Sequence, residues 1–178
     1  MFCLKKYIIG LVVFILVFIS IKSHKGAFAL TNFLSLNNTK LNTQNVNDVE
    51  QEIGENLYRI LSERTRIMQG VTFGSLSIEE GEHQLSNLLE DPLLETDINY
   101  LRQVLEYPTD IEEIIAMKLG PVQNLMLSEN DSILHFTSEV VWTFKDMDQI
   151  SEMEICYTFE LAETPTGTYK LRNYYLVQ

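Results

Sequence analysis

The spacing of apolar residues changes part-way along this 178-residue chain, at Gly120-Pro121. Before this point apolar residues recur every three or four positions, as one buried face of an α-helix requires. After it they alternate with polar residues, which is typical of a strand with one buried and one wet face. The pattern therefore predicts an α+β fold, with helices first and an antiparallel sheet second.

Four helices are expected before Gly120, and their ends are marked by capping and stop signals. Ser77-Ile78-Glu79-Glu80 and Asp110-Ile111-Glu112-Glu113 have the pattern of a capping box, which begins a helix. Gly70 and the prolines at 92, 108 and 121 are expected to end helices. The expected helices cover, in order, residues 46–70, 77–91, 96–108 and 110–119.

Four strands are expected after Pro121, in a curved antiparallel meander whose concave face the helices cover. They cover residues 122–127, 133–144, 151–161 and 168–177, with turn residues between them. We expect Glu160 to pair with Lys170, and Thr158 with Arg172, because acids on one strand then meet bases on the next. The apolar faces of the middle strands supply the candidate pocket lining: Leu134, Trp142, Tyr157 and Phe159.

The N-terminus carries an apolar run without a charge, residues 7–21, with lysines on both sides. An uncleaved signal-anchor, crossing the membrane once with 7–21 as its core, is favoured by the Ile, Val and Phe content. A signal peptide covering residues 1–29 is the other interpretation, with cleavage after Ala29 in Ala27-Phe28-Ala29. The first interpretation predicts a cell-membrane protein with its C-terminal domain outside the cytoplasm, and the second a secreted one.

Residues 30–45 are rich in Asn, Thr, Ser and Leu and are expected to be a linker to an extracytoplasmic domain of residues 46–178. The net charge is −12, and no acidic residue precedes Asp48, so the acidity is concentrated in that domain. An acidic domain is repelled by phosphate backbones and anionic lipid head groups. Nucleic-acid binding is therefore not expected, and the domain should stand off the membrane surface.

Residues 46–178 combine helices first and strands second with C-terminal hairpins around Trp142-Thr143-Phe144 and Tyr174-Tyr175-Leu176. This element order and these hairpins resemble the NTF2-like (cystatin-like) superfamily. The resemblance implies a cone of helices packed into a curved sheet. Members include small isomerases and dehydratases, ligand binders, and membrane-anchored assembly domains similar to those of secretion and conjugation machines. The last group has the same layout of short tail, membrane segment, linker and domain.

Enzymes of this superfamily commonly use Asp and His inside the cone, and no such pair is expected here. His135 falls on the outer face of its strand, and His83 falls off the apolar stripe of its helix. Cys156 has the acid Glu154 beside it, which disfavours the thiolate. The acids around Glu79 and Asp91 lack the spacing of a calcium loop, and the chain has no phosphate-binding glycine loop. We therefore expect no catalytic, cofactor-binding or metal-binding residue.

These expectations favour a non-enzymatic, membrane-associated binding or assembly domain outside the cytoplasm. A protein partner or a second copy of the chain would bind to the outer face of the sheet or to the first helix. The alternative is a small-ligand carrier or lyase/isomerase that uses the cone interior, secreted if the chain is cleaved at Ala29. An open pocket with a polar pair around Tyr157 would favour the alternative.

Overall fold

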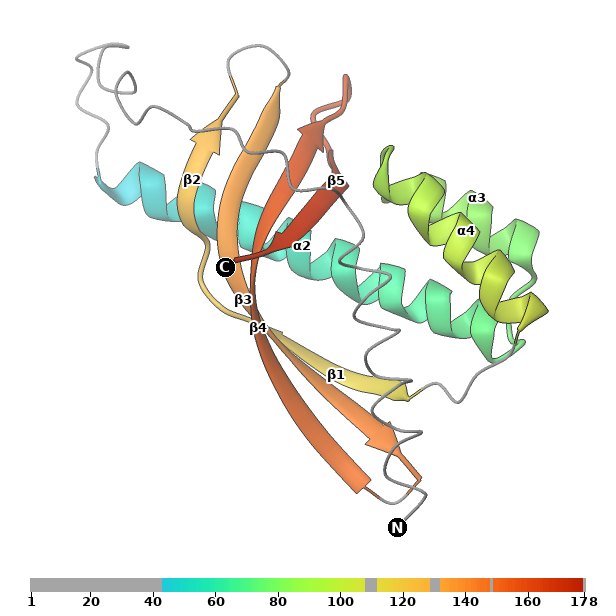
Figure 1. The fold of residues 1–178 in the computed structure, drawn as a ribbon. Helices are drawn as coiled ribbons and strands as arrows, with labels where there is room; N and C mark the ends of the chain where they lie inside the picture. The colour runs from blue at the N-terminus through green and yellow to red at the C-terminus, as the bar shows by residue number, and fades with distance from the viewer. Residues whose placement is uncertain (1–42, 108–111, 129–131, 148, 178) are drawn as a thin grey trace.

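The computed structural model describes residues 43–107, 112–128, 132–147 and 149–177. Three helices pack on an antiparallel sheet of five strands that does not close on itself (Figure 1), so the α+β class is confirmed. The helices are α2 (Thr43–Thr72), α3 (Ile78–Ser86) and α4 (Leu93–Glu106). The strands are β1 (Glu113–Leu119), β2 (Gln123–Leu127), β3 (Ile133–Asp146), β4 (Gln149–Glu163) and β5 (Tyr169–Leu176).

The longest helix, α2, crosses the sheet and buries one apolar stripe against it (Figure 1). The stripe has the three- and four-residue spacing of a helix face: Ile53, Leu57, Ile60, Leu61, Ile67 and Val71. The helix continues past Gly70, so the expected end is wrong by two residues. Gly74, with φ +76°, adopts the left-handed conformation in the turn that follows the helix.

The capping box at the start of α3 is confirmed. The amide of Glu80 donates to the hydroxyl of Ser77 at 3.2 Å, and the amide of Ser77 donates to the carboxylate of Glu80 at 3.0 Å. These hydrogen bonds satisfy two donors that a helix start would otherwise leave unpaired, and they lower the pKa of Glu80. The helix ends at Ser86, before the expected stop at Asp91-Pro92.

We expect Ser77→Ala to lower the free energy of unfolding by about 1 kcal/mol, because it removes the acceptor for the Glu80 amide. The change is measured as a shift of the urea midpoint followed by circular dichroism. Ser86→Ala is the control, since the Ser86 hydroxyl only donates to the His83 carbonyl on the exposed end of the same helix. Equal effects of the two changes would contradict a capping role.

The expected fourth helix, residues 110–119, is wrong: its second part is strand β1. This strand pairs with the C-terminal part of β3, where Met117 lies opposite Trp142 and Leu119 opposite Val140. With its amide oriented to satisfy both groups, Gln69 on α2 donates to the carbonyl of Ile114 at 3.2 Å and accepts from its amide at 2.6 Å. The pairing of β1 with the long strand β3 and its contact with α2 outweigh the local helix-start signal at residues 110–113.

The sheet therefore has five strands instead of the expected four, in the order β1-β3-β4-β5. Strand β2 also pairs with β3, along its N-terminal part. The expected strands at 122–127, 133–144, 151–161 and 168–177 are confirmed as β2 to β5, with ends that differ by one or two residues. The core between sheet and helices includes Phe136, Val140, Leu161 and Leu171.

The expected register between the last two strands is wrong. Glu160 lies opposite Asn173, and Thr158 lies opposite Tyr175. A bulge between Glu160 and Leu161 shifts the pairing, so residues of β5 after it change face. Lys170 instead lies opposite Ala162, and its ammonium group donates to the Ser86 carbonyl at the end of α3, at 2.6 Å.

Of the helices in the described part of the chain, none is both long and apolar enough to cross a membrane. The expected membrane segment at residues 7–21, the cleavage site at Ala29 and most of the linker lie outside the described residues.

Candidate functional site

The four candidate lining residues lie at or beside the hydrophobic core. Phe159 belongs to that core with 1% of its surface exposed, and its ring stacks on Phe136 at a centroid distance of 5.6 Å. Leu134, Trp142 and Tyr157 are half-buried and pack against the core. The rings of Tyr157 and Phe159 are 5.6 Å apart. All four candidate side chains therefore belong to the hydrophobic core or pack against it.

A buried ion pair joins α2 to α4 in the same region. The guanidinium of Arg64 donates to both carboxylate oxygens of Asp97, from Nε at 2.6 Å and from Nη2 at 2.7 Å. Arg64 is 6% exposed and Asp97 is 2% exposed. Nη2 also donates to the Tyr174 hydroxyl at 3.4 Å, and the guanidinium carbon lies 5.6 Å from the centre of the Tyr174 ring.

Four elements, α2, α4, β4 and β5, bring together a buried cluster, which we define as Arg64, Asp97, Tyr100, Tyr157 and Tyr174. Arg64 occupies a position on the buried face of α2, and Asp97 occupies one on the buried face of α4. The β5 bulge turns Tyr174 onto the core face, where its ring meets that of Tyr157 edge-on at 5.4 Å. Unbroken alternation along β5 predicts Tyr174 on the wet face with Lys170 and Arg172, and this prediction is wrong.

Sequence reasoning missed the ion pair, although the sequence held a signal for it. Arg64 falls four residues after Ile60 and three before Ile67, within an apolar stripe. Asp97 falls four residues after Leu93 and four before Leu101. A charge at an inward position is costly unless it has a partner, so two opposite charges at such positions indicate a pair.

Burial shapes the protonation of the whole cluster. Desolvation raises the pKa of Tyr100 to about 12, and it also raises the pKa values of Tyr174 and Tyr157. Desolvation alone would lower the pKa of Arg64, but the Asp97 carboxylate and Tyr174 raise it overall. The cluster is therefore a charged pair surrounded by neutral phenols. Among the described residues, every buried side-chain nitrogen or oxygen has a hydrogen-bond partner.

The other residues weighed for chemistry are scattered over the surface. Nδ1 of His135 lies 3.6 Å from the Glu160 carboxylate on the outer face of the sheet. Cys156 is exposed on that face, and His83 is exposed on α3. In the described ranges, no three His, Cys, Asp or Glu side chains gather as a metal site would need.

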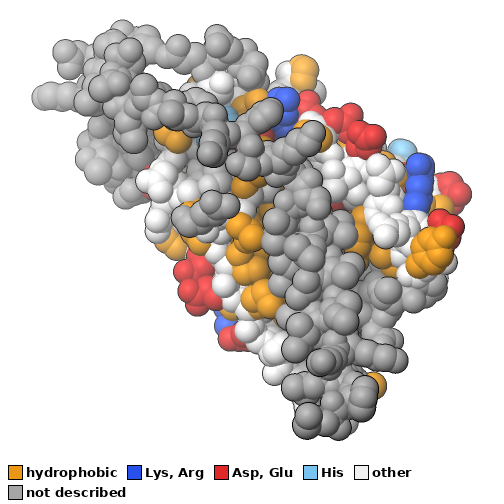
Figure 2. All heavy atoms as spheres, viewed as in Figure 1, with side chains coloured by type: hydrophobic (Ala, Val, Ile, Leu, Met, Phe, Trp, Pro, Cys, Tyr) orange, Lys and Arg blue, Asp and Glu red, His pale blue; other side chains and the backbone are white. Residues whose placement is uncertain are grey.

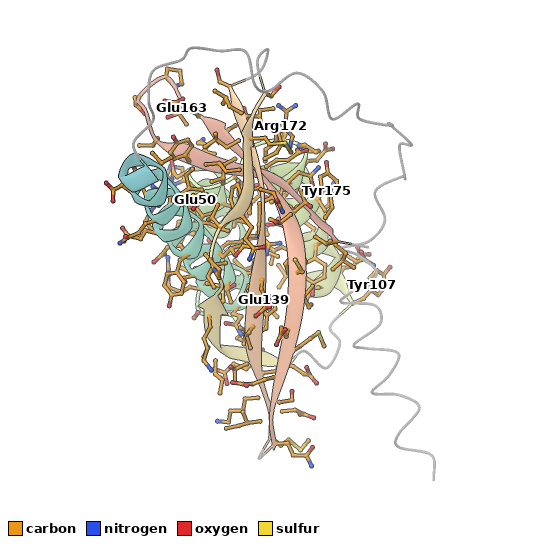
Figure 3. All side chains as sticks on the ribbon, turned by 90° about the vertical axis from the view of Figure 1, so that its left-hand side faces the viewer. Glu50, Tyr107, Glu139, Glu163, Arg172 and Tyr175 are labelled. Carbon is orange, nitrogen blue, oxygen red and sulfur yellow. The ribbon has the colours of Figure 1, made fainter. Side chains whose placement is uncertain are left out.

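The face of the sheet opposite α3 and α4 carries mostly polar groups. Figure 3 shows Glu139 and Tyr175 on this side. The Tyr175 hydroxyl donates to Glu160 at 3.3 Å and accepts from the Asn173 amide at 2.7 Å. Figure 2 shows acidic side chains along the left-hand margin of the sheet, which belongs to this face.

Comparisons with known proteins found likeness among solved structures. No protein-family model matches the chain, and no curated protein matches it. Among solved structures, the chain is similar to the intermembrane-space region of the chloroplast protein ARC6, with a TM-score of 0.47 and 12% sequence identity. That match covers 70% of this chain and 95% of the other. A likeness of this size carries no argument about function.

Proposed function

We propose that the chain is a non-enzymatic binding or assembly protein, with its domain held at a membrane outside the cytoplasm and related to the NTF2-like superfamily. The observation that carries the proposal is the long β3–β4 hairpin, which projects beyond the helices (Figure 1). Apolar side chains are exposed at its tip, where Met147 is 81% exposed and Ile150 is 66% exposed. Apolar side chains that are this exposed at a projecting tip favour a contact with another protein.

The cone interior supports the same proposal. Arg64 and Asp97 bind each other and are sealed from solvent, so the charged groups beside Tyr157 stabilise the domain instead of facing a ligand. The alternative carrier or lyase/isomerase is favoured by one observation: a polar pair does lie near Tyr157 and Tyr174. For that pair to bind a ligand, Asp97 would have to release Arg64, which is a costly step for a buried pair.

The proposal predicts a partner at the hairpin tip. A photo-crosslinking amino acid at Ile150 in the full chain, in its native membrane, should give a crosslinked product of higher mass. The same amino acid at Glu79, exposed on α3, is the matched control and should give none. The mass of the full chain in detergent, measured by light scattering, then tells a second copy from another protein. A monomeric chain without crosslinks from Ile150 would contradict the proposed function.

A further inference from the structure

Part of strand β4 has a neighbour on one side only. Strand β3 pairs with β4 from Gln149 to Ala162. Strand β5 pairs with β4 only between Tyr157 and Glu163, and one further hydrogen bond joins the Val177 amide to the Cys156 carbonyl at 3.0 Å. Residues 149–155 of β4 therefore have no strand on their other side within the described chain. We call these residues the open edge.

Two hydrogen bonds show which backbone groups of the open edge face outward. The Cys156 carbonyl points to the β5 side, since it accepts from Val177. Its opposite residue Glu139 points its carbonyl away from β4, to the Gly120 amide at 2.8 Å. Because backbone direction alternates along an antiparallel strand, Glu154, Glu152 and Ile150 point their amides and carbonyls outward. The open edge thus presents the unpaired pattern that another strand needs.

The side chains of the open edge differ sharply between its two faces. Glu152 and Glu154 are exposed on the outer face, where Glu139 lies close enough to Glu154 for the charge of Glu154 to raise the pKa of Glu139. Lys118 lies 3.4 Å from Glu152 and compensates part of this charge. On the other face, Met153 and Ile155 are half-buried. A strand that fits here would be basic on one side and apolar on the other.

We propose that the open edge binds an extended segment of a partner protein, which adds a strand to the sheet beside β4. Its lysine or arginine side chains, at alternate positions, lie opposite Glu152 and Glu154, and its apolar side chains pack beside Met153 and Ile155. Backbone hydrogen bonds supply affinity in this mode, and side chains supply selectivity. This inference rests on the proposed binding function and names the surface and the chemistry of the partner.

A second copy of the chain fits this edge poorly. If two open edges paired antiparallel with full overlap, Glu152 would lie opposite Glu152 of the other copy. Like charges directly opposite each other destabilise a strand pair. Charge complementarity therefore favours a different, basic segment.

The probe for the test is a synthetic peptide of alternating valine and lysine, long enough to span residues 149–155. Trp142, the single tryptophan, reports binding by its fluorescence because it lies opposite Met153. The full chain in detergent should bind this peptide saturably, and it should not bind a peptide with glutamate in place of lysine. The double variant Glu152→Lys/Glu154→Lys should bind the lysine peptide with about tenfold lower affinity, and it should bind the glutamate peptide. Glu55→Lys/Glu106→Lys, on exposed helix positions, is the matched charge control and should leave binding unchanged.

A second pair of variants tests the backbone. Glu152→Pro removes an amide that faces the open edge but no hydrogen bond to β3, while Glu152→Gln removes the same charge and keeps the amide. The proline variant should lose almost all binding of the lysine peptide, while its circular dichroism spectrum stays unchanged. The glutamine variant should lose only part of that binding. The proposal would be overturned if the proline and glutamine variants bound the lysine peptide equally well. It would also be overturned if the unchanged chain bound the lysine and glutamate peptides equally well.

The proposed function and this inference fail in different ways. If Ile150 crosslinks to a partner but the lysine peptide does not bind, the binding function stands, and the addition of a basic strand to the open edge is overturned. If light scattering gives a dimer that Glu152→Pro converts to a monomer, the occupant is a second copy, and the basic partner is overturned. If the lysine peptide binds only after residues 1–42 are removed, the chain's own N-terminal part is the occupant of the edge. That result also overturns the proposed basic partner.

Discussion

Replacing Asp97 by alanine is expected to lower the free energy of unfolding by about 3–5 kcal/mol, because it leaves a charged guanidinium buried without its partner. Arg64 is almost fully buried and makes two short hydrogen bonds to Asp97, so solvent cannot replace the lost charge. The effect is measured from urea unfolding curves followed by circular dichroism. It should appear as a lower midpoint with an unchanged slope.

Glu82→Ala is the control for this prediction. Glu82 forms an equally short ion pair with Arg102, at 2.6 Å, but the Arg102 side chain is 61% exposed. Loss of an exposed pair costs about 0–1 kcal/mol, since solvent screens it. Replacing both Arg64 and Asp97 by leucine should restore much of the stability that Asp97→Ala loses. If Asp97→Ala were no more costly than Glu82→Ala, the buried pair would not be the stabilising feature that its geometry indicates.

Phe159→Ala is expected to lower the free energy of unfolding by about 3–5 kcal/mol, because it opens a cavity in the centre of the core. The Phe159 ring lies among three others, Phe136, Tyr157 and Tyr174, at centroid distances of 5.6, 5.6 and 6.2 Å. These neighbours belong to three different strands, so they cannot all move inward to fill the space. The same unfolding measurement tests the change.

Ile150→Ala is the matched control, since it also truncates an apolar side chain on β4, but at the exposed tip of the hairpin. It should change the free energy of unfolding by less than about 0.5 kcal/mol. The comparison also tests the role of the candidate lining residues. A small loss of stability for Phe159→Ala would indicate a residue that lines an open space, and would favour the ligand-carrier alternative.

Local signals in the sequence were sufficient wherever an element is determined by its own residues. The capping box at Ser77 defined the start of α3 because its hydrogen bonds close within four residues. The two-residue alternation of β3 and β4 identified both strands, because one face of each packs on the helices and the other does not. The same alternation placed Phe136 and Phe159 in the core.

Elements determined by distant residues could not be predicted in this way. A local helix-start signal at 110–113 suggested a helix, but pairing with β3 and the Gln69 side chain make the following residues a strand. Helix propensity is worth only a few tenths of a kcal/mol per residue, which a row of strand hydrogen bonds and a buried face outweigh.

The sequence by itself determined the fold class, the four C-terminal strands and the face that the apolar side chains bury, because these follow from the period of the apolar residues. Only the tertiary structure decided the β1 pairing, the contact of Arg64 with Asp97 and which described residues of β4 are paired on one side alone, because each depends on residues far apart in the sequence. The β4–β5 register is a further case, since the bulge in that pair shifts the register and moves Tyr174 to the core face. A shift of one residue exchanges the two faces of a strand, and the pattern of a single strand does not show where its partner bulges.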